Sequence, residues 1–293
     1  MKQKYDKVIS MVKKTSKKGG TKSTKNVNSA VKTLGNKITM VSLNKWNRIL
    51  FAVHALQGLA VLLLAQNTSF PVTTNYLTID PLASSSGQPV LVNATRNLFS
   101  VNVAYLVVAF FFMSAVAHLL VATRYRKQYE SNLKKGINKA RWIEYSFSAS
   151  TMMVAIALLS GIYDLTSLIA IFVLTKVMNL MGLLMEVHNQ TTSKTNWLSY
   201  WVGVKAGIIS WVAVTIYLVG ANVYGSGNIP SFVYWIYGSM FVLFSSFAIN
   251  MLLQYKKAGR WADYLYGERV YMILSLVAKS LLAWQIFFGA LRP

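Results

Sequence analysis

Residues 98–122 read LFSVNVAYLVVAFFFMSAVAHLLVA and contain no charged side chain. A helix that crosses the roughly 30 Å hydrocarbon core of a bilayer needs about 20 predominantly apolar residues. Within lipid, one segment can satisfy all of its backbone N–H and C=O groups only as a helix. The stretch therefore predicts a transmembrane helix.

Six further windows of spanning length that are predominantly apolar surround it. The seven predicted spans are Trp46–Gln66, Leu98–Ala122, Trp142–Tyr163, Thr166–Val187, Trp197–Ala221, Phe232–Gln254 and Glu268–Ala290. Together they predict an all-α membrane protein, in which residues 45–293 form one domain of seven transmembrane helices.

The composition agrees with a membrane protein and excludes several other classes. Hydrophobic residues make up 54% of the 293 residues and charged residues 13%, about half the share usual in soluble domains. A nucleic-acid-binding protein could carry the net charge of +22, but it would not also carry long apolar runs. The chain has no cysteine, so it has no disulfide, thiol nucleophile or cysteine-bound zinc.

The basic residues predict how the helices are oriented. Twenty-five lysines and arginines lie in the N-terminal segment up to Arg48 or in and beside the loops on that same side, whereas only Arg96 and Arg292 lie on the other side. Loops rich in lysine and arginine stay in the cytoplasm. The N-terminus is therefore expected in the cytoplasm and, after seven spans, the C-terminus outside.

Two segments lie outside the predicted helices. Residues 1–44 are rich in lysine and lack a sustained apolar face, which predicts a disordered cytoplasmic tail or an anchor on anionic lipid. Residues 67–97 form a long outer loop, for which we expect a short hairpin or a partner contact. In this loop Asn67 and Asn93 each begin a glycosylation acceptor pattern.

Three lysines lie inside the predicted spans, where a charge is costly and marks a candidate functional site. Lys205 is near enough to a helix end to reach the interface. Lys176 and Lys279 lie about 15 Å from either surface, whereas a lysine side chain reaches only about 6 Å. Each amine is therefore neutral, paired or covalently used.

The neighbouring polar residues favour Lys279 as the functional lysine. Glu144 is the one carboxylate well inside a span, and its predicted depth matches that of the Lys279 amine, which makes a buried ion pair possible. Polar pairs four residues apart stack on one helical face, and together they predict an internal polar cavity. These pairs are Ser275 with Lys279, Glu144 with Ser148, and Ser114 with His118, and His54 with Gln57 adds a further polar face.

The sequences around these residues resemble the heliorhodopsins, a family of retinal-binding proteins with seven helices and a cytoplasmic N-terminus. The resemblance covers about residues 43–293. It is carried by residues 141–150, RWIEYSFSAS, by residues 264–268, YLYGE, and most specifically by residues 268–285, ERVYMILSLVAKSLLAWQ. It implies a rhodopsin-like bundle.

The resemblance also implies roles for individual residues. Lys279 would bind all-trans-retinal covalently as a Schiff base, with Glu144 as the counterion of the protonated form. Ser275 and Ser148 would hydrogen-bond around that pair. A cavity toward the cytoplasm would be lined by His54, His118 and Ser114. The polyene would pack against Tyr145, Trp201 and Phe244.

The implied function is light sensing by photoisomerisation and a slow photocycle, without enzymatic activity. The implied partners are the bilayer, a second copy of the chain in a homodimer and an unidentified signalling protein, and not nucleic acid.

Two alternatives remain open. In a light-gated proton or ion conductance, Lys176 would lie along the ion path, and currents in voltage-clamped cells compared with Lys176→Ala would test this role. An intramembrane zinc hydrolase would need His54, His118 and His188 at one metal. No two of these histidines have the spacing of a helical metal site, so we expect no metal.

Overall fold

The computed structural model describes residues 38–292. Every element discussed below belongs to one compact unit, Met40–Pro293. Of the predicted Lys-rich tail, residues 1–44, the part up to residue 37 lies outside the described residues. Residues 40–44 of that tail belong to the first helix.

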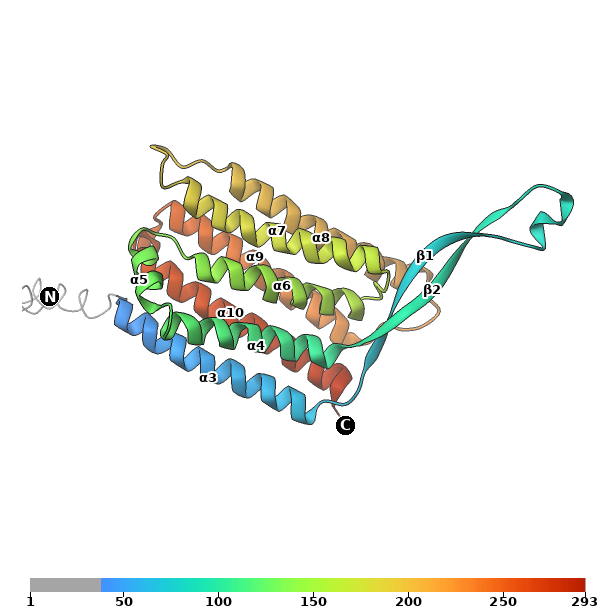
Figure 1. Cartoon of the computed structure of the whole chain (residues 1–293), viewed down its shortest axis with the longest axis horizontal. Coiled ribbons are helices and arrows are strands. Elements are labelled where there is room, and N and C mark those ends of the chain that lie inside the picture. Colours follow the sequence, from blue (N-terminus) through green and yellow to red (C-terminus); the bar gives the residue numbers. More distant parts are fainter. Residues whose placement is uncertain (1–37, 293) are drawn as a thin grey trace, which may run out of the picture. The chain divides into compact units, whose positions relative to one another are not determined.

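Among residues 38–292, seven helices are long and apolar enough to cross a membrane, as the sequence predicts. They run side by side as a bundle (Figure 1). Their bounds are α3 Met40–Leu64, α4 Val103–Ala122, α6 Lys139–Leu159, α7 Leu165–His188, α8 Leu198–Tyr224, α9 Ser231–Tyr255 and α10 Tyr264–Ile286, which continues as a π-helical turn over Phe287–Leu291.

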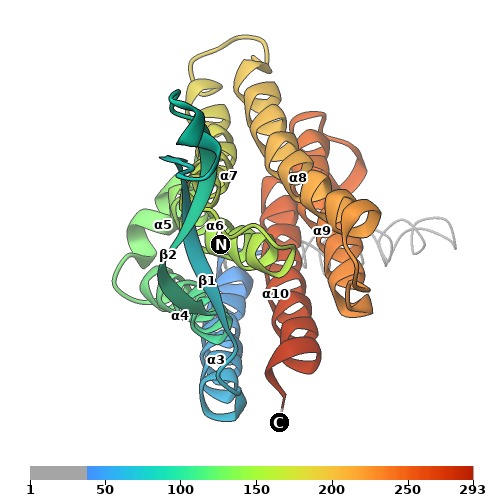
Figure 2. The ribbon, with the colours of Figure 1, turned by 90° about the vertical axis from the view of Figure 1, so that its right-hand side faces the viewer.

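Helix α6 lies at the centre of the bundle and has the most buried span. It packs against α4 on one side and α7 on the other, while α3 lies along α4 and α9 along α10 (Figure 2). Large apolar side chains on the outer faces, such as Leu63, Ile216 and Trp235, are exposed. An outer surface of this kind is stable when lipid covers it.

The loop between the first two spans forms a long β-hairpin that extends from one end of the bundle (Figure 1). Strand β1 (Ser69–Ile79) pairs antiparallel with β2 (Leu91–Asn102), and a short 3-10 helix, η1 (Ala83–Ser86), lies in the turn. The loop thus forms a hairpin, as expected, but a long one rather than a short one, with strands of 11 and 12 residues. The predicted second span is corrected, because residues 98–102 are strand. The Asn102 side chain accepts a hydrogen bond from the N–H of Ala104 (2.9 Å) and so caps α4.

The opposite end carries most of the basic loops, and we call it the basic end. It includes the short helix α5 (Arg126–Lys134) and the 3-10 turn η2 (Gly259–Ala262). Helices α3, α6, α8 and α10 begin there, and α4, α7 and α9 end there. The first turns of α6 and α10 at this end carry residues of the functional site.

Gly182 of α7 allows α6 and α7 to approach closely. A Cβ atom at this position would lie 2.4 Å from Cζ3 of Trp142, a buried residue of α6. Gly182→Ala is therefore expected to lower the free energy of unfolding by about 1–3 kcal/mol, as overpacking of a core does. Thermal denaturation of the detergent-solubilised protein measures this effect.

Gly220 of α8 provides the matched control. It is also a helical glycine, but a Cβ atom there meets nothing within 4 Å. Gly220→Ala should leave the melting temperature unchanged or raise it slightly, because alanine favours helix more than glycine does. Equal melting temperatures for Gly182→Ala and the unmodified chain would contradict the packing argument.

Candidate functional site

Lys279 lies on α10 in the interior of the bundle, with its side chain only 3% exposed. Its Nζ donates a hydrogen bond to Oγ of Ser275, one helical turn earlier (2.8 Å). The same Nζ lies 3.3 Å from Oε1 of Glu144 on α6. A buried charge is tolerated when it has an opposite charge and hydrogen bonds in good geometry, and Lys279 has both.

Glu144 is fixed in turn by a third helix. Its side chain is 8% exposed, and Oε1 accepts a hydrogen bond of 2.5 Å from the hydroxyl of Ser114 on α4. The centre of the site is therefore held by α4, α6 and α10. These contacts bring together the amine, the carboxylate and two of the hydroxyl groups that the sequence singles out.

Ser148 differs from the sequence-based expectation. It lies one turn after Glu144 on α6 and is completely buried, but its hydroxyl has no hydrogen-bond partner among the described residues. The prediction that Ser148 hydrogen-bonds around the Lys279–Glu144 pair is therefore not met within this part of the chain. A buried hydroxyl of this kind is rare and calls for an explanation.

His54 of α3 and His118 of α4 form a stacked pair, with ring centroids 5.6 Å apart and an interplanar angle of 6°. Nδ1 of His118 lies 2.8 Å from Oδ1 of Asn47, whereas neither ring nitrogen of His54 has a partner among the described residues. His188 lies at the end of α7, 3.3 Å from the Asn196 amide. The structure does not bring the three histidines together.

A cavity of about 40 Å³ with charged and polar residues in its wall lies next to this pair, on the side toward the basic end. His118 lines it as predicted, together with Glu144, but His54 and Ser114 are not among its lining residues. The cavity reaches instead to Arg141 and Glu268.

A second cavity, of about 40 Å³, begins at Lys279 and is walled mostly by carbon. Its walls come from four helices: Tyr145, Ala149 and Met152 of α6, Met178 and Asn179 of α7, Phe244 and Phe247 of α9, and Ser275, Ala278 and Lys279 of α10. The Tyr145 ring lies 5.1 Å from Nζ of Lys279. Tyr145 and Phe244 thus line the cavity that begins at Lys279, whereas their packing on a polyene stays a prediction.

Trp201 is not part of this wall, contrary to the prediction. Its side chain is 56% exposed and packs edge-on against Tyr200. The buried tryptophan of α8 is Trp211, whose ring lies 5.8 Å from that of Phe244. Two side chains ten residues apart are separated by about 280° around the helix axis, after whole turns are subtracted. The two tryptophans therefore occupy different faces of α8.

Lys176 lies apart from the functional lysine. It is half-buried on α7, and its Nζ lies 4.4 Å above the ring of Phe147, an exposed residue of α6. Lys176 lines neither of the two cavities described above. Its predicted place along an ion path gains no support from this position.

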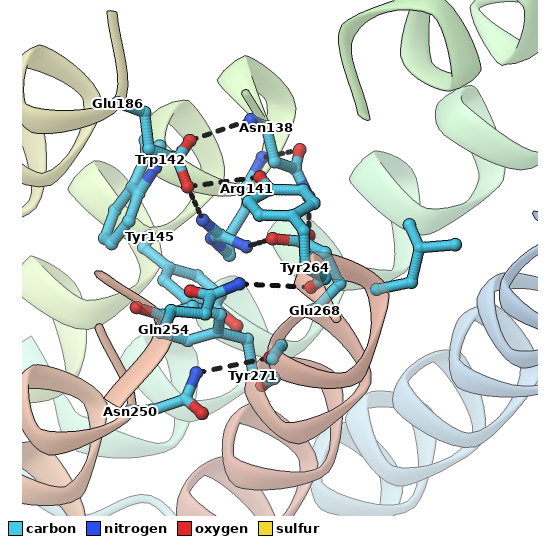
Figure 3. A network of polar contacts seen from close by, with 12 residues as sticks. Asn138, Arg141, Trp142, Tyr145, Glu186, Asn250, Gln254, Tyr264, Glu268 and Tyr271 are labelled. Atoms are coloured by element: carbon cyan, nitrogen blue, oxygen red, sulfur yellow. Dashed lines mark hydrogen bonds and ion pairs between the residues drawn. The ribbon is translucent and has the colours of Figure 1, made fainter. Parts of the chain in front are cut away.

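A buried charge cluster at the basic end was missed in the sequence (Figure 3). Arg141 of α6 lies between two carboxylates, forming ion pairs with Glu186 of α7 and Glu268 of α10. All three residues are buried, with exposures of 7%, 1% and 1%. The charge count treats Arg141 as a loop residue, and the carboxylates lie at the ends of predicted spans.

The spacing of these residues gives a signal that could have found the cluster. Arg141 lies three residues before Glu144, and Glu268 lies eleven residues before Lys279. Three residues are about one helical turn and eleven about three turns. Arg141 therefore shares a helix face with Glu144, and Glu268 shares one with Lys279.

Comparisons with known proteins agree with this architecture. A protein-family model described as Heliorhodopsin matches residues 43–291. No curated protein matches the chain significantly.

Among solved structures, a light-driven proton pump from Leptosphaeria maculans is similar, with a TM-score of 0.58 and 14% identity over 84% of this chain and 92% of that chain. Cyanorhodopsin from the cyanobacterium Tolypothrix sp. has a TM-score of 0.57 and 11% identity over 87% of this chain and 96% of that chain. At such identities the likeness shows the fold alone, and it confirms the predicted rhodopsin-like bundle.

Proposed function

Because this chain belongs to the heliorhodopsin family, we propose that it is a photoreceptor in which Lys279 carries retinal as a protonated Schiff base and Glu144 is the counterion. Family and fold support a retinal-binding, light-responsive, multi-pass integral membrane protein. The finer assignment depends on one observation: the buried amine of Lys279 lies 3.3 Å from Glu144, at the wall of a carbon-lined cavity.

The residues around Lys279 suit retinal. Phe244, Phe247 and Met152 would hold a hydrocarbon chain by apolar contact, and the small side chains of Ala149 and Ala278 leave room beside the amine. The cavity volume of about 40 Å³ lies below the roughly 300–1,000 Å³ of small-molecule pockets, so retinal binding would require the side chains of this wall to move apart. The unpaired hydroxyl of Ser148, one turn from Glu144, is a further group available to a ligand.

Bound retinal, which we expect to be all-trans in the dark, would supply visible absorption and light-driven isomerisation. The protein would hold a proton on the Lys279 nitrogen, because the negative charge of Glu144 stabilises the protonated form. The Ser114 hydroxyl, 2.5 Å from Glu144, would fix the carboxylate. Ser275, 2.8 Å from Nζ, would fix the nitrogen.

The proposal includes an orientation and an assembly. The 25 basic residues on one side against two on the other favour a cytoplasmic basic end, with the N-terminus inside and the C-terminus outside. From the family resemblance we expect a homodimer, a slow photocycle and a signalling partner rather than enzymatic activity. The mass of the solubilised protein and flash photolysis would test the first two.

Lys279→Ala tests the attachment site. Protein expressed with all-trans-retinal should be coloured, and the variant should lose its visible absorption band completely, because alanine has no amine to form the linkage. The measurement is the absorption spectrum of the purified protein. Persistence of the band in Lys279→Ala would contradict the proposal, as would a colourless unmodified protein.

Lys176→Ala is the matched control, since Lys176 is the other lysine deep within a predicted span. Its amine contacts Phe147 and lies outside the cavity that begins at Lys279. This variant should keep both the band and its intensity. Loss of colour in both variants would indicate a folding defect rather than a lost attachment site.

A further inference from the structure

The cluster of Arg141, Glu186 and Glu268 contains two carboxylates and one cation. If both carboxylates are ionised, the buried cluster carries one uncompensated negative charge. A buried uncompensated charge is costly, and one bound proton would make the cluster neutral. The cluster therefore has the charge balance of a site that can gain and lose a proton.

The hydrogen bonds indicate which carboxylate takes that proton (Figure 3). Glu186 accepts from four donors: the Asn138 N–H (2.8 Å), the Trp142 indole (2.8 Å), the Arg141 guanidinium and the Tyr264 hydroxyl (3.2 Å). Four donors fill the lone-pair sites of a carboxylate, so a proton on Glu186 would have to displace one of them.

Glu268 has fewer donors. It accepts from the Asn138 side chain (2.6 Å) and from Arg141, and it shares the Tyr264 hydroxyl with Glu186. These bonds leave an acceptor position on Glu268 open to a proton.

Glu268 also shares a cavity with Glu144, which Glu186 does not. The cavity, of about 40 Å³, is lined by Glu144 and His118 and also by Glu268 and Arg141. Water in the liquid occupies about 30 Å³ per molecule, and a polar cavity of this kind can hold it. Water in this cavity would connect the two carboxyl groups.

Tyr129 of α5 is a further wall of this cavity. Burial, together with the nearby charge of Glu268, raises the pKa of Tyr129 above its ordinary value. Its phenol therefore stays protonated and neutral, and it does not compete with Glu268 for a proton. The Arg141 Nε, which has no partner among the described residues, is another polar group at this wall.

Tyr264 separates the cluster from the surface at the basic end. Its hydroxyl lies 3.2 Å from Glu186, and its side chain also lines an outer cleft of about 290 Å³ together with Lys257 and Trp261. Glu268 is only 1% exposed. A proton on Glu268 is therefore held within the protein.

We propose that Glu268 is a second proton-binding site, which takes up through this cavity the proton that Glu144 receives from the Lys279 nitrogen after illumination. The O–H bond of the Glu144 carboxyl breaks, and an O–H bond forms on Glu268. One negative charge thereby moves from the cluster to Glu144, and no other reactant is needed. This inference rests on the proposed function, because the proton starts on the nitrogen that carries retinal.

Infrared difference spectra, light minus dark, test the transfer. The chain has only four glutamates, Glu130, Glu144, Glu186 and Glu268, so isotope labelling of glutamate isolates their carboxyl bands. Glu268→Gln should keep the visible absorption and lose the late band of a protonated glutamate. Glu268→Asp should restore a carboxyl band outside the glutamate label.

The matched controls are Glu186→Gln in the cluster and Glu130→Gln on the surface, both of which should keep the late band. Ala117→Phe, which fills the cavity from α4, should delay its rise severalfold. A late band that persists in Glu268→Gln overturns the inference while leaving the proposed function intact, and a colourless wild-type protein overturns the proposed function.

A second readout needs neither light nor retinal. Acidification of the labelled, retinal-free protein in the dark should protonate Glu268 before Glu186, since Glu268 has the open acceptor position. The first buried carboxyl band should therefore be absent in Glu268→Gln and present in Glu186→Gln. The opposite result would show that Glu186 takes the proton and would overturn the inference.

Discussion

Glu144→Gln is expected to shift the absorption of the retinal-loaded protein at neutral pH from the visible toward the ultraviolet. Removing one partner of a buried ion pair costs about 3–5 kcal/mol, which is more than a hundredfold in the proton-binding constant of the Lys279 nitrogen. Without Glu144 the nitrogen would lose its proton near neutral pH. Absorption spectra recorded over a pH titration measure this change.

The surface variant Glu130→Gln is the control. Glu130 pairs with Arg126 one turn earlier on α5, and both side chains are substantially exposed. Its removal should leave the visible band and its pH dependence unchanged. A visible band in Glu144→Gln with the pH dependence of the unmodified protein would exclude Glu144 as the counterion.

Arg141→Met is expected to destabilise the protein strongly. The methionine would leave the buried carboxylates of Glu186 and Glu268 without their cation, and breaking a buried ion pair in this way costs about 3–5 kcal/mol. The melting temperature of the purified protein, or its yield if the variant does not fold, measures the effect. The stacking of Arg141 on the Tyr271 ring, 4.0 Å from its centroid, would also be lost.

Two comparisons separate this electrostatic effect from a loss of packing. Arg126→Met removes an exposed ion pair and should cost at most about 1 kcal/mol. The triple variant Arg141→Met, Glu186→Gln, Glu268→Gln removes the unpaired charges and should recover much of the lost stability. If the triple variant is no more stable than Arg141→Met alone, the carboxylates are not the cause.

The helical fold could be predicted because a helix that crosses a bilayer needs about 20 predominantly apolar residues. Each of the seven predominantly apolar windows overlaps a helix. The start of α4 could not be found in this way, because residues 98–102 are as apolar as a span but pair with β1. The Asn102 cap, which ends the strand and begins the helix, is a single polar residue within an apolar run.

The Lys279–Glu144 pair could be predicted because depth along a helix follows directly from residue counting. The aromatic wall could not, since it depends on how each helix is rotated, and Trp201 was assigned to the wrong face of α8. Arg141 was misassigned for a different reason. The loop that begins after the second span was predicted to extend past residue 139, so the buried guanidinium of Arg141 was counted among the basic residues of that loop.

The junction between the hairpin and the bundle has a mechanical consequence. Strand β2 ends at Asn102 and α4 begins at Val103, so no flexible linker separates them. The base of β1 is tied to the adjoining turn, where the Thr73 N–H donates to the Tyr163 carbonyl (2.8 Å). A force applied to the hairpin tip would thus be transmitted directly to α4, the helix that carries Ser114.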